Sequence, residues 1–167
     1  MKPTTLALKN FKAIGSNEQQ IELAPITLLF GPNSAGKSTV LQSLIYLREI
    51  LLHRNYDPDK TVLGGDWLDL GGFENLVHGH NRDESIKIGM TFDLTEEELP
   101  DFLSEHERDA LDNMELPAVS DFFEDLETAS IELTLSWSSS LHRPVIERFD
   151  CRMNDQAIAT ITSSLDG

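Results

Sequence analysis

The chain has 167 residues, of which 40% are hydrophobic and 25% charged, and its formal net charge is −16. A chain of this size can bury one globular core, and its single cysteine, Cys151, excludes an internal disulfide. No apolar run approaches membrane-spanning length, the N-terminus lacks the apolar core of a signal peptide, and no Lys/Arg cluster marks a nucleic-acid footprint. We therefore predict a soluble cytoplasmic protein, with no membrane and no direct nucleic-acid contact in this chain.

Two predicted strands open the chain. Residues 4–11 and 18–23 each alternate apolar and polar side chains, and the stretch 13–17 between them is rich in turn-forming residues. This pattern predicts an antiparallel hairpin that precedes the rest of the fold.

A phosphate-binding motif follows the hairpin. Residues 26–30, Ile-Thr-Leu-Leu-Phe, indicate a strand buried on both faces, as in parallel sheets. Residues 31–39 fit the pattern G-x-x-x-x-G-K-[ST], and residues 40–52 carry apolar side chains at helical spacing. A strand, a glycine-rich loop and a helix in this order form a cradle for phosphate groups.

The residue types of this motif suit ATP bound with Mg²⁺. Gly31 and Gly36 let the backbone approach a phosphate closely, and successive N–H groups then point into the loop. We expect Lys37, as the catalytic cation, to contact the β- and γ-phosphates and the Ser38 hydroxyl to bind Mg²⁺. The predicted nucleotide-binding residues of the motif are Gly31, Pro32, Asn33, Ser34, Ala35, Gly36, Lys37, Ser38 and Thr39.

Loop and strand follow the predicted helix. Between residues 64 and 77, paired glycines flank a short apolar turn of helix. His78 and His80 have no third ligand at a suitable spacing, so the pattern favours a surface turn over a metal site. Residues 84–94 predict a strand with four apolar side chains on one face.

Most of the negative charge lies in one segment. Residues 93–127 contain fourteen acidic residues and one basic residue, Arg108. Apolar residues fall there at helical spacings, and Pro100 and Pro117 divide the segment into at least two helices. We predict an acidic helical insertion whose apolar face packs on the domain. The alternative is a docking surface for a basic partner or a mimic of nucleic-acid charge.

The end of the chain returns to strands. Residues 131–137, 145–153 and 156–163 have strand patterns, and the pair Asn154-Asp155 is a two-residue hairpin signal. The predicted fold class is α/β, a P-loop NTPase lobe with an antiparallel β-meander and an acidic helical insertion. We expect one lobe over residues 1–167, with a P-loop core at 4–92, the insertion at 93–128 and antiparallel strands at 129–167.

This arrangement resembles the N-terminal lobe of ABC-type ATPase heads in the SMC, RecF and OLD (overcoming lysogenization defect) families. Residues 8–14 look like their opening of a strand, Asn-Phe and a basic residue, and residues 26–39 match their phosphate-binding loop. Residues 69–78 are similar to a segment of bacterial AAA-type ATP-binding proteins of the OLD-like branch, several of which are associated with phage defence. The resemblance places Lys12 where a basic residue approaches the nucleotide.

The chain departs from these families in what it lacks. No run of four apolar residues ends in Asp-Glu, so there is no Walker B motif, and there is no Ser-Gly-Gly signature motif. In the families a C-terminal lobe supplies both, so the resemblance implies a fragment of a longer protein or a partner that completes it. It also implies ATP-driven dimerisation of heads, with hydrolysis controlling a nuclease or other effector in DNA repair or phage defence.

Two other functions remain open from the sequence. The missing Walker B motif also fits a nucleotide-sensing interaction module without turnover. A small P-loop kinase needs several arginines in a mobile lid, whereas Arg143, Arg148 and Arg152 lie on predicted strands and Arg108 lies among acids.

Overall fold

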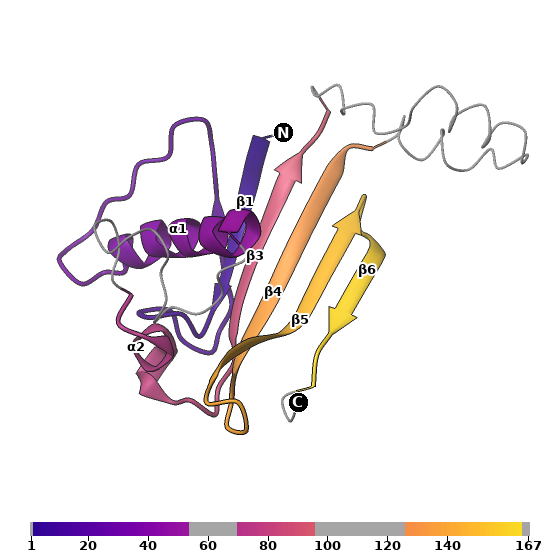
Figure 1. Cartoon of the computed structure of the whole chain (residues 1–167). Helices are drawn as coiled ribbons and strands as arrows, with labels where there is room; N and C mark the ends of the chain where they lie inside the picture. Colours follow the sequence, from indigo (N-terminus) through magenta and orange to yellow (C-terminus); the bar gives the residue numbers. More distant parts are fainter. Residues whose placement is uncertain (1, 54–69, 96–125, 165–167) are drawn as a thin grey trace, which may run out of the picture.

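The computed structural model describes residues 2–53, 70–95 and 126–164. Within these ranges the chain forms a six-stranded sheet in the order β2-β1-β3-β4-β5-β6, and every neighbouring pair is antiparallel (Figure 1). The strands are β1 (Lys2–Lys9), β2 (Gln19–Glu22), β3 (Ile86–Asp93), β4 (Thr128–Ser138), β5 (Arg143–Met153) and β6 (Gln156–Thr162). The helical segments are α1 (Lys37–His53), α2 (Phe73–Leu76) and the 3₁₀ turn η1 (His78–His80).

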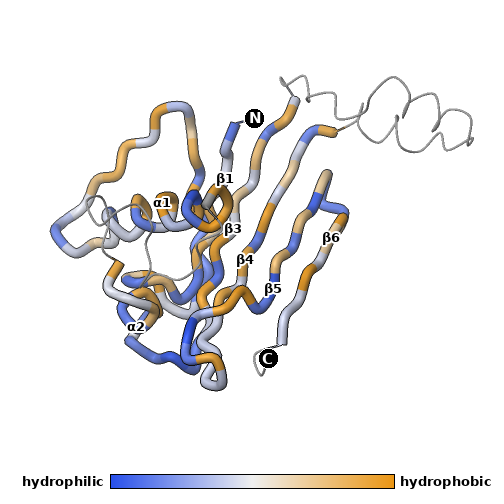
Figure 2. Tube along the Cα trace, in the orientation of Figure 1, coloured by the Kyte–Doolittle hydropathy of each residue, from blue (hydrophilic) through white to orange (hydrophobic). Residues whose placement is uncertain are grey.

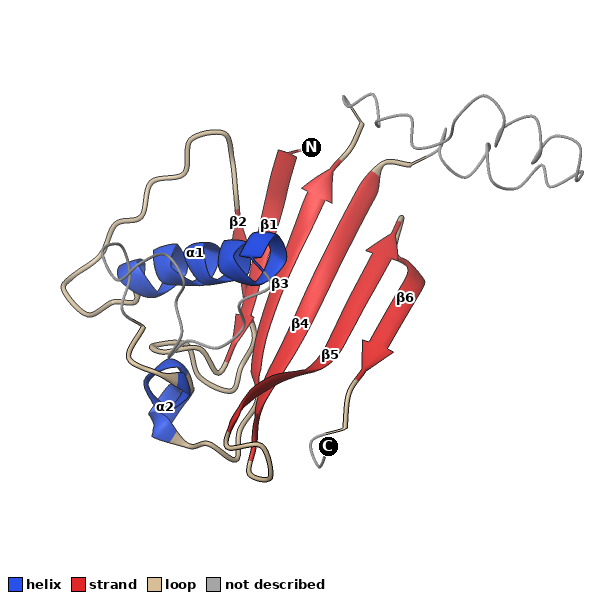
Figure 3. Cartoon of the chain, in the orientation of Figure 1, coloured by secondary structure: helices blue, strands red, loops and turns tan. Residues whose placement is uncertain are grey.

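The alternating side chains of the strands build the core. Leu8 of β1 pairs with Ile88 of β3, which pairs with Leu133 of β4, and all three side chains are almost fully buried. Helix α1 lies across this face of the sheet, where Tyr46 and Leu47 join the same hydrophobic cluster (Figure 3). The predicted hairpin, the predicted helix and the predicted later strands are therefore confirmed.

The turn between β5 and β6 follows from its two residues. Asn154 and Asp155 have φ of 45° and 62°. Positive φ at both central residues is what a type I′ hairpin turn requires, and Asn and Asp tolerate this region better than most residues. The turn sets Met153 opposite Gln156, so the two-residue hairpin predicted at this point is confirmed.

The strand predicted at residues 26–30 is wrong. The structure assigns no strand there, and Ile26, Leu28 and Phe30 are 82%, 70% and 85% exposed. In Figure 2 the segment between β2 and α1 arches away from the sheet. A strand buried on both faces lies inside a sheet whose two faces are both covered, and residues 26–30 pair with none of the six described strands.

Within the described part of the chain, helix α1 is also covered on one side only. Its buried side chains face the sheet, whereas Leu41, Ile45, Leu51 and Leu52 are exposed. The phosphate-binding motif therefore lies between two exposed apolar stretches, residues 26–30 before it and the outer side of α1 after it. We refer to them together as the two exposed stretches.

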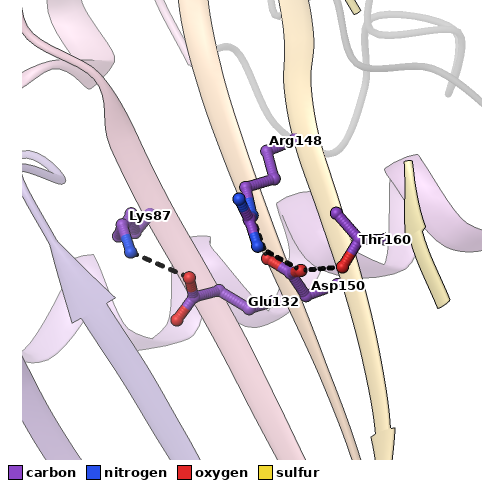
Figure 4. A network of polar contacts seen from close by, with 5 residues as sticks. All are labelled: Lys87, Glu132, Arg148, Asp150 and Thr160. Carbon is purple, nitrogen blue, oxygen red and sulfur yellow. Dashed lines mark hydrogen bonds and ion pairs between the residues drawn. The ribbon is translucent and has the colours of Figure 1, made fainter. Parts of the chain in front are cut away.

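The sheet face turned away from α1 is polar, and its charges pair both across strands and along β5 (Figure 4). Lys87 Nζ lies 2.8 Å from Glu132 Oε1 on the next strand. Arg148 donates to both carboxylate oxygens of Asp150, at 2.6 and 2.8 Å, and the Thr160 hydroxyl donates to Asp150 at 2.6 Å. The Arg148 guanidinium and the Thr160 hydroxyl lower the pKa of Asp150 from the ordinary 3.8 to about 2.

Part of the predicted chain lies outside the described residues. This holds for residues 54–69 and for most of the acidic insertion, residues 96–125. Among the helices that the structure does describe, none is long and apolar enough to cross a membrane.

Candidate phosphate-binding site

The loop of residues 31–36 enters helix α1 directly. Gly31 and Gly36 have φ of 154° and 88°, values that a residue with a Cβ rarely adopts. Helix α1 begins at Lys37, and Val40 N donates to Gly36 O at 3.2 Å. The N–H groups of the first turn have no partner within a helix, so this end of α1 favours an anion.

The Lys37 side chain turns back over the loop that precedes it. Its ammonium donates to Gly31 O at 2.8 Å and to Pro32 O at 2.6 Å. A lysine ammonium has three N–H donors, so one remains for a further acceptor such as a phosphate oxygen. The two contacts hold the positive charge at the loop and beside the helix N-terminus.

A second turn, residues 10–15, lies beside this loop. A Cβ placed on Gly36 would lie 3.6 Å from the Cβ of Ala13, so the two backbones approach closely. Asn10 N donates to Gly15 O at 2.9 Å, and the Asn10 amide donates to Ser85 O at 3.1 Å. The first bond closes the turn, and the second ties it to the residue just before β3.

The segment of α2 and η1 clamps the same turn. Lys12 N donates to Leu76 O at 2.6 Å, and His78 N donates to Asn10 O at 3.0 Å. The His78 ring adds a contact of 2.7 Å from Nδ1 to Lys12 O, and because a carbonyl only accepts, Nδ1 is the donor. The clamp sets Lys12, whose φ is 50°, beside the phosphate-binding loop.

These three segments enclose a cavity of about 500 Å³. This volume lies within the range of pockets that take small-molecule ligands. Three predicted site residues, Gly31, Pro32 and Ala35, do not line the cavity, although the first two accept hydrogen bonds from Lys37. The predicted site residues that line it are Lys12, Asn33, Ser34, Gly36, Lys37, Ser38 and Thr39.

The sequence did not indicate the remaining lining residues. They are Ala13, Asn75, Val77, Gly79 and His80. The last four reach the cavity through the pairing of Phe11 with Val77, a contact between residues far apart in the chain that no motif encodes. The sequence pattern marks His80 only as a possible metal ligand together with His78.

The surface turn predicted at His78 and His80 is confirmed. Both histidines are exposed in η1, and each Nδ1 faces a main-chain carbonyl, Lys12 O for His78 and Glu74 O at 3.0 Å for His80. Throughout the described part of the chain, no three His, Cys, Asp or Glu side chains gather as a metal site would need.

The donor set of the cavity fits Mg²⁺ only in part. Ser38 contributes a hydroxyl from the first turn of α1, as a magnesium site beside phosphates requires. Mg²⁺ is usually held by one or two carboxylates in addition, and no Asp or Glu is among the described residues that line the cavity. A complete magnesium site would need a carboxylate from elsewhere.

A glycine-rich loop, a helix that starts at its lysine and an antiparallel sheet behind them define the class: the chain has a P-loop NTPase fold. Residues 5–48, which include most of β1, all of β2, the loop and most of α1, match the family model of an AAA domain. No curated protein sequence matches the chain.

The chain is similar in fold to a solved structure described as "Structural biochemistry of ATP-driven dimerization and DNA stimulated activation of SMC ATPases". The TM-score is 0.51 at 14% sequence identity, and the match covers 95% of this chain and 73% of that chain. The chain therefore shares the fold of a solved SMC ATPase structure, as the sequence resemblance predicted.

Proposed function

We propose that this chain binds ATP with Mg²⁺ as one lobe of an ATPase head. One observation carries the proposal: the N-terminus of α1, with Lys37 as its first residue, forms a wall of a cavity large enough for a nucleotide. This end of α1 combines three features that stabilise a polyphosphate. They are the unpaired N–H groups of the first helical turn, the positive end of the helix dipole and the Lys37 ammonium.

Each site residue has a role in this proposal. Main-chain N–H groups of residues 31–39 bind the phosphates, and Lys37 contacts the β- and γ-phosphates. Ser38 binds Mg²⁺, which bridges phosphate oxygens and neutralises their charge. Lys12 approaches the nucleotide from the turn that the α2–η1 segment clamps.

We further propose that a second lobe completes the head. The cavity offers Mg²⁺ no carboxylate from the described residues, and hydrolysis needs a group that positions water. The two exposed stretches support the same idea, because residues 26–30 would become a buried strand once parallel strands pair beside them. The second lobe belongs to the same protein or to a partner.

The completed head would hydrolyse ATP and dimerise. The solved SMC ATPases to which this chain is similar in fold are described as undergoing ATP-driven dimerisation. Two heads that enclose ATP and release on hydrolysis would control a nuclease or other effector, in DNA repair or in phage defence. The acidic insertion at residues 93–128 is a peripheral part of the lobe in this proposal.

The alternative is a nucleotide-sensing module without turnover. The lack of a carboxylate among the described lining residues is the observation that favours it. Both functions need ATP binding, so they differ only in hydrolysis.

Calorimetry with ATP and Mg²⁺, followed by a phosphate-release assay, tests the proposal. We expect binding by the chain alone and phosphate release only when a lobe carrying a Walker B motif is added. Binding without release in every mixture would select the sensing module. If neither ATP nor inorganic tripolyphosphate binds, the proposed phosphate site is wrong.

A further inference from the structure

One wall of the cavity has no role in the proposal above. It consists of residues 75–80, which leave the short helix α2 and enter η1. The phosphate-binding loop forms another wall, so a nucleotide anchored there by its phosphates turns its nucleoside half toward the remaining lining residues. The polar atoms of this wall are therefore the groups that a base in the cavity would meet.

The hydrogen bonds of Asn75 determine which of its atoms remains for a ligand. Its Nδ2 donates to the main-chain oxygen of Gly71. A carbonyl oxygen only accepts, so the amide nitrogen is the atom that faces it and the amide oxygen Oδ1 is left as an acceptor.

The same reasoning applies to His80. Its Nδ1 lies 3.0 Å from Glu74 O, which also only accepts. In the neutral ring the proton is therefore on Nδ1, and Nε2 is an acceptor. The wall thus presents two hydrogen-bond acceptors, one from each residue.

Two acceptors suit some parts of a nucleotide and not others. Phosphate oxygens are acceptors themselves and are served by Lys37 and the helix N-terminus. A base supplies a flat ring, and Ala13 and Val77 supply apolar lining beside the two acceptors. Space is present as well, because a Cβ placed on Gly79 would meet no atom of the described chain within 4 Å.

We propose that Asn75 and His80 select adenine. The exocyclic 6-amino group of adenine carries two N–H donors, which match Asn75 Oδ1 and His80 Nε2. Guanine and hypoxanthine carry a carbonyl oxygen at the same position, which would place an acceptor against two acceptors and leave all of them unsatisfied. This inference rests on the proposed function and names the residues that select its base.

Calorimetry of the whole chain with Mg²⁺ and a set of triphosphates tests it. ATP, inosine triphosphate and purine riboside triphosphate share the phosphates and the ribose and differ at position 6. We expect inosine triphosphate to bind roughly two- to tenfold more weakly than ATP, because Asn75 and His80 are exposed and the mismatch loses about one net hydrogen bond. Purine riboside triphosphate, which has only hydrogen at position 6, should lie between them.

Variants with matched controls assign the effect to the two residues. Asn75→Ala and His80→Ala should each reduce the preference for ATP over inosine triphosphate. His142→Ala is the control for His80→Ala, because His142 is also exposed and has a similar φ of 53°, compared with 59°. Asn17→Ala is the control for Asn75, and Asn17 is exposed and absent from the cavity.

The outcomes separate this inference from the function on which it rests. Equal affinity for ATP and inosine triphosphate in the unchanged chain would overturn the base assignment and leave the phosphate site in place. A loss with 2′-deoxy-ATP but none with inosine triphosphate would put the acceptors on the ribose and also overturn it. Failure of both ATP and tripolyphosphate to bind would remove the proposed function and the inference together.

Discussion

The antiparallel sheet and the segment from residue 24 to residue 53 differ in how fully the described chain pairs their backbone groups and buries their apolar side chains. Each inner strand of the sheet pairs with two neighbours, one face is buried, and charged groups on the other face pair with one another. The segment that contains the phosphate-binding loop pairs with no strand of the described sheet and exposes large apolar side chains before and after the loop.

This difference distinguishes the sheet, which stabilises the fold, from the loop segment, which in our proposal binds the ligand. Sheet hydrogen bonds and a shared apolar core make β1, β3, β4 and β5 mutually dependent. The loop instead leads into the first turn of α1, whose N–H groups have no acceptor within the helix, and among the described residues Lys37 donates to main-chain oxygens of the loop. Its requirements are met by phosphates and, in our proposal, by strands of a second lobe.

Core and exposed leucines should give the largest contrast. Leu133→Ala removes a side chain that is 1% exposed in the middle of the sheet, and we expect it to lower the free energy of unfolding by about 2–5 kcal/mol. Leu28→Ala removes one that is 70% exposed and should change it by less than about 0.5 kcal/mol. Urea unfolding followed by circular dichroism measures both. A large loss for Leu28→Ala would show that residues 26–30 already belong to the core.

Lys37→Ala should do the reverse, with a large effect on the ligand and little on the fold. We expect ATP affinity to fall roughly 30- to 150-fold, because a charge-assisted hydrogen bond of about 2–3 kcal/mol is lost. Lys9→Ala is the control, since Lys9 is a half-buried lysine of β1 outside the cavity. Calorimetry with ATP compares the two variants, and equal affinities would contradict the phosphate role of Lys37.

Removal of the clamp on the Lys12 turn tests how far the sheet and the loop are coupled. His78→Ala deletes the ring contact to Lys12 O, and we expect ATP affinity to fall roughly three- to tenfold, the equivalent of about one hydrogen bond. The same titration with His142→Ala serves as the control. Unchanged affinity would mean that the main-chain contacts alone hold this turn.

We expect the pH dependence of the free energy of unfolding to come from the polar sheet face and not from the phosphate-binding loop. The pKa of Asp150 is about 2 in the folded chain, below the ordinary 3.8, because Arg148 and Thr160 stabilise the carboxylate. Its contribution is therefore present above about pH 4 and is lost as the pH falls toward 2.

Asp150→Asn removes this contribution and should destabilise the chain by about 1 kcal/mol at pH 7. The difference from the unchanged chain should shrink when urea unfolding is repeated near pH 2. A difference that stays constant between the two pH values would show that Asp150 acts through packing and that its charge is unimportant.

The sequence predicted where the helices and strands lie better than it predicted which segments pack beside them. Alternation along β1, β3 and β4 placed Leu6, Ile86 and Leu133 on one buried face, because a strand turns successive side chains to opposite sides. The same kind of argument wrongly predicted a strand at residues 26–30. An apolar run shows only that a segment can be buried. Whether it is buried depends on neighbours that the described part of the chain does not supply.

The candidate site divides in the same way. Sequence alone determined the loop at residues 31–39 and the start of a helix after it, since glycine, lysine and serine at fixed spacing act through local backbone geometry. The tertiary structure decided that Lys12, Asn75 and His80 share a cavity with that loop. It did so through pairing of Phe11 with Val77, and contacts between distant segments depend on how the chain folds back on itself.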